Sequence, residues 1–163
     1  MARIPTSVKR RLPRLRRRRQ REIQAPTSVR STTPFRYDAS FRIAGVGKFH
    51  EEISLMTGIA ATKSHKSGDV RRFGSKRVWL QDLWILDSPL GEEASLDDHL
   101  QWLWNTIEPH KSYFASLISR ATWADVCVGC LSESAYPVLS ASSASLSMIR
   151  EINLSLSFNF TCV

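Results

Sequence analysis

The chain has 163 residues, of which 42% are hydrophobic, and this is enough for one domain with a substantial core. No run of 18 or more apolar residues occurs, and no apolar segment follows the basic N-terminus, so we expect neither a membrane span nor a secretory signal. The formal net charge of +8 is unevenly distributed. Residues 1–36 contain twelve Lys and Arg and one acidic residue, whereas residues 37–163 contain eleven basic and fourteen acidic residues.

Residues 1–36 are predicted to form a disordered basic arm, because they are rich in Arg, Pro, Ser and Thr and poor in large apolar side chains. Such an arm could contact the phosphates of nucleic acid or an acidic surface. The alternatives are an extension without a function and a mitochondrial presequence, although the prolines near the arginine run disfavour an amphipathic presequence helix. The candidate nucleic-acid-binding residues are Arg14, Arg16, Arg17, Arg18, Arg19 and Arg21.

A single globular domain is predicted over residues 37–163. It begins with a short strand at 41–46 and continues with a helix at 49–56, which we expect to end at Gly58 because glycine readily adopts the left-handed conformation. A long polar loop at 62–74 follows, and loops of this length in compact domains are often functional. The residues expected on the buried face of the helix are Phe49, Ile53 and Met56.

The segment 77–107 predicts a strand followed by an amphipathic helix. Apolar residues at 78–86 fall on both faces of an extended chain, which indicates an interior strand. Ser95 is a suitable N-cap, and Asp98 completes an aspartate version of the capping box. Pro109 ends the helix and begins a second one. The expected buried stripes are Leu96, Leu100, Leu103, Trp104 and Ile107 in the first helix, and Tyr113, Phe114, Leu117 and Ile118 in the second.

The C-terminal third predicts strands at 121–131 and 136–139, a helix capped by Ser140, and a final strand at 154–162. The final strand alternates apolar and polar residues, which is typical of an antiparallel or mixed sheet with one face open to solvent. We therefore predict an α+β two-layer domain with a mixed or antiparallel sheet of four to five strands and three to four helices.

Several short motifs occur in this order: FRIAG (41–45), FHEEI (49–53), TGI (57–59), KSGD (66–69), the strand containing Trp84, SLDDHLQWL (95–103), Leu139-Ser140 and the alternating C-terminal strand. Together they resemble the bacterial domain-of-unknown-function family 4279 over about residues 37–163. The motifs are caps, turns and core positions, so the resemblance implies a fold. It supplies no activity, because the family has none established.

The sequence does not favour an enzyme or a metal site. Cys127 and Cys130 have C-x-x-C spacing, but only Cys162 remains as a further thiol, whereas structural zinc needs four ligands. We interpret the pair as core cysteines, and three cysteines are consistent with a reducing cytoplasm. An enzyme that uses His50 or His99 is a third hypothesis, but no Ser or Cys in the context of a nucleophile elbow accompanies these histidines. No metal, cofactor or catalytic residue is predicted.

The basic loop beside the tryptophan strand is the strongest candidate for a functional surface. Basic side chains next to an aromatic ring can bind an anion, a nucleic-acid backbone or an acidic protein; the alternative is a solvated surface loop. Trp102 lies off the buried stripe and could be an interface anchor, or it could pack against a neighbouring element. We predict a bacterial, non-catalytic macromolecule-binding protein of the immunity or adaptor kind, with nucleic-acid binding through the arm as the alternative. The candidate partner-binding residues are Lys63, His65, Lys66, Arg71, Arg72, Arg77, Trp79 and Trp102.

Overall fold

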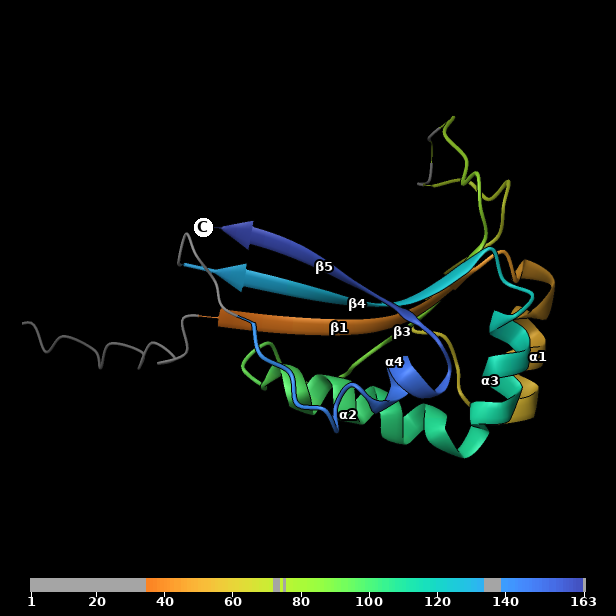
Figure 1. Cartoon of the computed structure of the whole chain (residues 1–163). Helices are drawn as coiled ribbons and strands as arrows, with labels where there is room; N and C mark the ends of the chain where they lie inside the picture. The colour runs from red at the N-terminus through yellow and green to blue at the C-terminus, as the bar shows by residue number, and fades with distance from the viewer. Residues whose placement is uncertain (1–34, 72–73, 75, 134–138, 163) are drawn as a thin grey trace, which may run out of the picture. The chain divides into compact units, whose positions relative to one another are not determined.

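The computed structural model describes residues 35–71, 74, 76–133 and 139–162. These residues form an α+β domain in which a five-stranded sheet is covered on one face by helices, as Figure 1 shows, so the predicted fold class is confirmed. The first strand begins at Phe35, two residues before the predicted start of the domain. The predictions for the arm at 1–34 and for most of the strand at 136–139 lie outside the described residues.

The sheet is mixed, and its strands lie in the order β2-β3-β1-β4-β5. The central strand β1 is antiparallel to both of its neighbours, β3 and β4, whereas β5 runs parallel to β4. A parallel neighbour requires a crossover connection, and the segment that contains α4 supplies it. The strands are β1 (Phe35–Ala44), β2 (Lys63–His65), β3 (Leu83–Asp87), β4 (Trp123–Ser132) and β5 (Ser155–Cys162).

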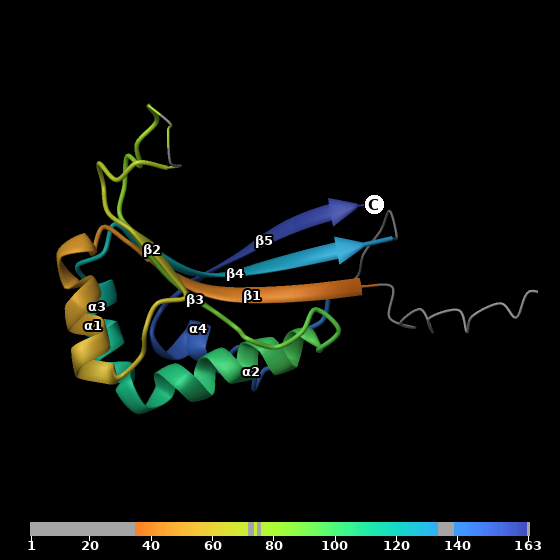
Figure 2. The ribbon, with the colours of Figure 1, turned by 180° about the vertical axis from the view of Figure 1, so that it is seen from behind.

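The helices lie on one side of this sheet. Figures 1 and 2 show α2 and α4 beneath the sheet and α1 and α3 together at one end of it. The opposite face carries no helix among the described residues, which agrees with the predicted sheet that is open on one side. The helices are α1 (His50–Thr57), α2 (Leu96–Ile107), α3 (Lys111–Ile118) and α4 (Ser147–Glu151), with 3₁₀ turns at Gly47–Phe49 and Glu108–His110.

The start of α2 follows the sequence prediction closely. The Asp98 backbone N–H donates to Ser95 Oγ at 3.1 Å, and the Ser95 N–H donates to the Asp98 carboxylate at 3.2 Å, so the capping box is complete. All five residues of the predicted stripe are buried. Gly58 adopts the left-handed conformation, with φ of 70°, at the end of α1, also as predicted. The core aromatic rings then pack edge to face, with Phe41 and Phe114 centroids 5.6 Å apart.

Several local predictions were wrong. The strand β3 starts only at Leu83, because Val78 pairs with Val70 in an isolated bridge of a separate hairpin. Met56 is 63% exposed on the outer side of α1 rather than buried. Ser140 does not cap a helix, since α4 begins at Ser147 without a side-chain cap.

The apolar face of β5 is only partly covered. Leu154 is buried and Leu156 packs against the core, but Phe158 is 43% exposed and Phe160 is 51% exposed. The alternation was predicted correctly, whereas the burial of the last apolar residues was not. The reason is that β5 forms an edge of the sheet, so its side chains lack a neighbouring strand on one side.

His99 is a completely buried polar residue on the core side of α2. Its Nδ1 lies 3.0 Å from Ser88 Oγ, and this contact ties the loop before α2 to the helix. Burial lowers the pKa of His99, and it outweighs the raising effects of the Gly91 backbone, Asp38 and Asp98. The imidazole is therefore neutral in the folded protein at neutral pH.

We predict that the free energy of unfolding decreases as the pH falls below about 6.5, the ordinary pKa of histidine. Between that value and the lowered pKa of His99, the unfolded chain binds a proton that the folded protein does not, so acid favours unfolding. Urea denaturation at a series of pH values should show a smaller decrease for His99→Asn than for the wild type. His110→Gln, at a half-buried position in a turn outside the core, is the control. An equal slope in His99→Asn and the wild type would contradict the assignment.

Candidate functional site

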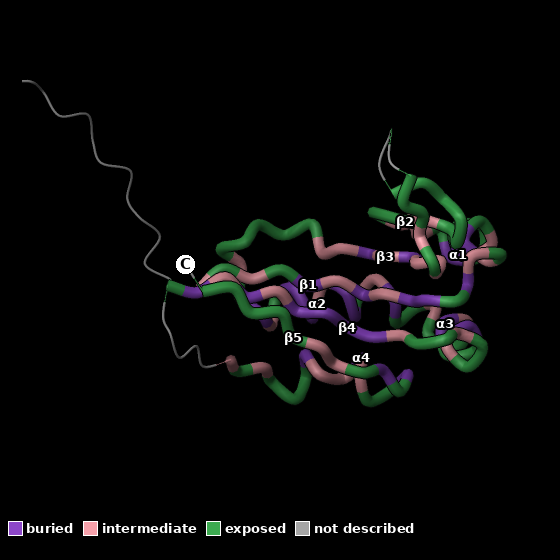
Figure 3. The backbone as a smooth tube through the Cα atoms, turned by 90° about the horizontal axis from the view of Figure 1, so that it is seen from above, coloured by how far each residue is buried: buried purple, intermediate pink, exposed green. Residues whose placement is uncertain are grey.

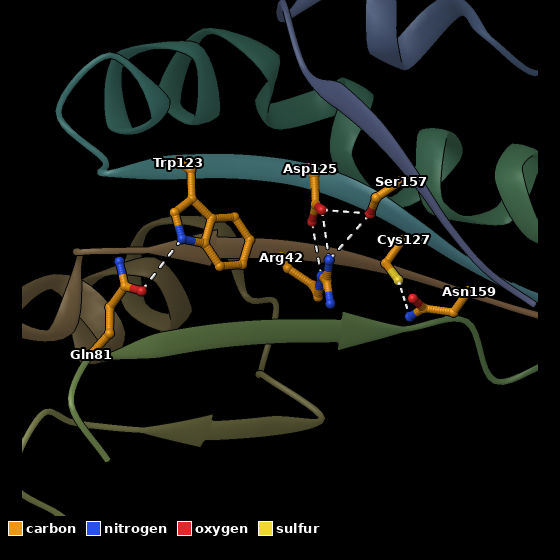
Figure 4. Close-up of polar contacts among 7 residues, drawn as sticks. All are labelled: Arg42, Gln81, Trp123, Asp125, Cys127, Ser157 and Asn159. Atoms are coloured by element: carbon orange, nitrogen blue, oxygen red, sulfur yellow. Dashed lines mark hydrogen bonds and ion pairs between the residues drawn. The ribbon is translucent and has the colours of Figure 1, made fainter.

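The open face of the sheet carries a partly buried ion pair at its centre. Arg42 on β1 and Asp125 on β4 are direct partners in the antiparallel register, so both side chains leave the sheet on the same face. Arg42 Nε donates to Asp125 Oδ1 at 2.8 Å, and Arg42 Nη2 donates to Oδ2 at 2.6 Å. Ser157 Oγ on β5 donates to the same Oδ2 at 2.6 Å, as Figure 4 shows. The hydrogen bond to Asp125 raises the pKa of Arg42, although burial acts in the opposite direction.

Trp123 extends this polar row toward the end of the sheet. The Arg42 guanidinium carbon lies 5.4 Å from the centroid of the Trp123 ring. Trp123 Nε1 donates to Gln81 Oε1 at 3.4 Å, which links β4 to the segment before β3 (Figure 4). The indole is 38% exposed, so part of it is available for contact from solvent.

Gly129 makes room for a carboxylate on the same face. It is the register partner of Asp38, and a Cβ at Gly129 would lie 2.5 Å from Asp38 Oδ2, so no larger residue fits without a shift. The space beside them is a hollow of about 410 Å³, and the ion pair of Lys63 with Asp87 at 2.8 Å lines it. The hollow thus contains charges of both signs.

The cysteine pair is divided between the two faces of β4. Cys127 and Cys130 are both buried, as predicted. Cys127 Sγ lies on the open side and accepts from Asn159 Nδ2 at 3.2 Å (Figure 4). Burial raises the pKa of the Cys130 thiol, which favours its protonated form. In the described part of the chain, no group of three or more His, Cys, Asp or Glu side chains could hold a metal ion.

The segment 66–82, called here the hairpin, projects from the open side of the sheet, and Figure 3 shows it as mostly exposed. Its two arms are joined by backbone bonds, including Trp79 N–H to Asp69 O at 2.8 Å and Arg71 N–H to Arg77 O at 2.9 Å. At its base, the His65 ring stacks on the Trp79 ring with centroids 3.8 Å apart. The Arg71 guanidinium carbon lies 4.6 Å from the same indole. The hairpin therefore presents an ordered aromatic and cationic stack.

The structure brings together three of the predicted binding residues, His65, Arg71 and Trp79. Lys63 and Lys66 lie nearby, but each forms an ion pair, with Asp87 at 2.8 Å and with Glu51 at 3.8 Å respectively; the bond to Asp87 raises the pKa of Lys63. The remaining predicted residues lie elsewhere on the hairpin, on the opposite side of the sheet, or outside the described residues. Trp102 is half-buried on α2, on the opposite side of the sheet, and packs against the core. Arg77 is exposed on the hairpin, whereas Arg72 and the arm residues Arg14, Arg16, Arg17, Arg18, Arg19 and Arg21 lie outside the described residues.

The two histidines of the enzyme hypothesis are both buried and are distant in the fold. His50 begins α1 and is 9% exposed, and His99 lies in the core. Burial lowers the pKa of His50, while nearby Asp82 acts in the opposite direction. His50 borders a surface hollow of about 590 Å³ that His65 and Lys66 also line.

The sequence analysis missed Arg42, Gln81, Trp123 and Asp125. A usable signal existed for Asp125, because it is the one charged residue of the largely apolar strand β4, and such residues are usually paired. Its partnership with Arg42 was not visible, since it depends on a register between strands 83 residues apart.

We predict that Arg42→Met lowers the free energy of unfolding by about 2–3 kcal/mol, because the Asp125 carboxylate is then buried without its cation. Adding Asp125→Leu in the same chain should recover part of the loss, since the uncompensated charge is removed. Urea denaturation measures both effects. Arg150→Met, at an exposed position on α4, is the control and should change stability by less than about 0.5 kcal/mol. A loss no larger than that of the control would contradict the structural importance of the pair.

Comparisons with known proteins give one match. The family model described as "Domain of unknown function (DUF4279)" matches residues 33–162. Neither the comparison with curated proteins nor that with solved structures finds a match. Within the described part of the chain, no helix is long and apolar enough to cross a membrane. The matched region contains every described helix and strand, and the chain belongs to the DUF4279 family.

Proposed function

We propose that this protein is a non-catalytic binding module of the bacterial cytoplasm, of the adaptor or immunity kind, and that it binds an acidic protein through the hairpin. The observation that carries the proposal is the stack of His65, Trp79 and Arg71 at the base of an exposed, projecting hairpin. Tryptophan and arginine supply much of the binding energy in known interfaces, especially where their side chains are already ordered.

Exposed apolar side chains on the same hairpin support a protein as the partner. Val70 is 57% exposed, Val78 is 40% exposed and Leu80 is 84% exposed. These three side chains give the hairpin exposed apolar surface in addition to its ordered indole. Protein interfaces combine apolar contacts in the centre with a polar rim, and the hairpin offers both kinds of residue.

The charges of the hairpin favour an acidic partner. Its two carboxylates are used internally: Asp69 accepts from the Lys66 backbone N–H at 2.6 Å, and Asp82 accepts from the Gly47 N–H. Basic residues outnumber acidic residues in the described part of the hairpin by four to two. They can accelerate association with a negatively charged patch and make it sensitive to salt. The described basic residues of the hairpin are Lys66, Arg71, Lys76 and Arg77.

We predict that charge reversal in the hairpin, with Arg71→Glu and Arg72→Glu together, abolishes capture of a stable partner. The tagged full chain is used to pull down partners from a lysate of its own host, and the bound proteins are compared by mass spectrometry. Trp79→Ala should weaken the same capture, because the stack loses its centre. Arg150→Glu reverses an exposed charge on α4 and is the matched control.

Circular dichroism should show that all of these variants are folded. Partners that remain bound to the double variant but are lost from Arg150→Glu would place the interface on the helical side. That result would contradict binding through the hairpin.

A second candidate function is nucleic-acid binding by the arm. The observation in its favour is the twelve basic residues against one acidic residue in residues 1–36. Phosphate contacts by such a segment release counterions, so affinity would fall steeply with salt and show little sequence preference.

We predict that the full chain binds duplex DNA weakly at low salt, and that replacing Arg16, Arg17, Arg18 and Arg19 with Gln reduces the slope of log affinity against log salt by roughly 3–4. Fluorescence anisotropy at several salt concentrations measures this slope. The hairpin double variant Arg71→Glu/Arg72→Glu separates the two candidates, because it should leave a slope produced by the arm unchanged. Absence of binding at about 50 mM salt would exclude this function.

A further inference from the structure

The two edges of the sheet differ in how well they are protected against pairing with another strand. At one edge, β2 has only three residues and carries Lys63. Short edge strands with a lysine are a common protection against unwanted pairing. At the other edge, β5 has eight residues and pairs only with β4 among the described strands.

The composition of β5 contains none of the usual protections. Its sequence, SLSFNFTC, has no charged residue, no proline and no glycine. Each of the other four described strands contains at least one charge: Arg36, Asp38 and Arg42 in β1, Lys63 in β2, Asp87 in β3 and Asp125 in β4. A long neutral edge strand of this kind is a template for pairing.

Two aromatic side chains of β5 are exposed on the helix-covered face of the sheet. Phe158 and Phe160 are the register partners of Val128 and Cys130, which are buried in β4. Their rings stack on each other with centroids 6.0 Å apart and an interplanar angle of 16°. The exposed edge that carries them is visible in Figure 3. The two rings form an apolar surface beside the outer backbone N–H and C=O groups of β5, which could pair with another strand.

We propose that two copies of this chain form a dimer by antiparallel pairing of their β5 strands, which joins the two sheets into one. A register centred on Asn159 places Phe158 of one copy opposite Phe160 of the other. Directly opposite residues of an antiparallel pair point to the same face of a sheet. The apolar residues of both copies therefore lie on one face of the joined sheet. Cross-strand aromatic pairs add stability to such a contact. A second copy is the favoured occupant, because pairing β5 with another neutral strand brings no unpaired charge to the contact. Among the described strands of this chain, only β5 is neutral.

This dimer is independent of the proposed function and compatible with it. The hairpin precedes β3 near the β2 edge, at the other side of the sheet from β5. Pairing through β5 therefore leaves both hairpins accessible. A dimer would present two of them, which increases the avidity for a partner with repeated acidic sites.

Sedimentation equilibrium of the full chain tests the proposal. The wild type should change from 18.5 kDa to twice that mass as the concentration rises through the micromolar range. Phe160→Lys places a charge on the exposed edge and should weaken the dimer at least about tenfold. Leu55→Lys is the matched control: Leu55 is 84% exposed on α1, and its replacement should leave association unchanged.

Thr161→Lys provides a second test that does not alter the aromatic surface, and it should also weaken the dimer, even if Phe160→Lys fails to fold. Hydrogen exchange identifies the interface directly: amides of β5 should exchange more slowly as the concentration rises, whereas those of the hairpin should not. A wild-type chain that stays monomeric at high micromolar concentration would overturn the proposal. So would an equal loss of association in Leu55→Lys and Thr161→Lys.

Discussion

Phe41 and Arg42 are neighbours on the central strand and point to opposite faces of the sheet, and most of the structure depends on this division. Phe41 packs against Phe114 in the core, while Arg42 is held by Asp125 on the open face. A slip of one residue in the register of β1 would place the guanidinium among the aromatic rings and the phenyl ring on the open face. Both errors are costly, so the two residues together fix the pairing of β1 with β4.

The same division separates the hydrophobic core from the proposed binding surface. The helix-covered face contains the aromatic core, the capped helix α2 and the buried His99. The open face contains the ion pair of Arg42 and Asp125, the exposed indole of Trp123 and the projecting hairpin. Changes in the hairpin can therefore test the proposed binding without disturbing the core. The fold alone does not specify an activity, and within a family of unknown function the evidence for binding is the chemistry of this surface.

Much of the fold could be predicted because its signals are local. The hydrogen bonds of the capping box join Ser95 to Asp98, three residues apart, and Gly58 ends α1 through its own backbone conformation. The buried stripe of α2 follows from helical spacing. Periodicity failed where burial depends on neighbours, as with Phe160 on an edge strand and Met56 on an outer helical face.

The candidate site was predicted only in part. The basic composition of the hairpin was visible in the sequence and directed attention to His65, Arg71 and Trp79, but their stacking required the turn that brings the two arms together. The sequence by itself determined the fold class, the capping box of α2, the glycine cap of α1 and the presence of a basic loop, because neighbouring residues encode them. Only the tertiary structure decided that Arg42 meets Asp125, that Trp102 lies on the opposite side of the sheet from the hairpin, and that β5 is an unprotected edge. These features depend on strand order and register, which arise from the packing of segments far apart in the chain.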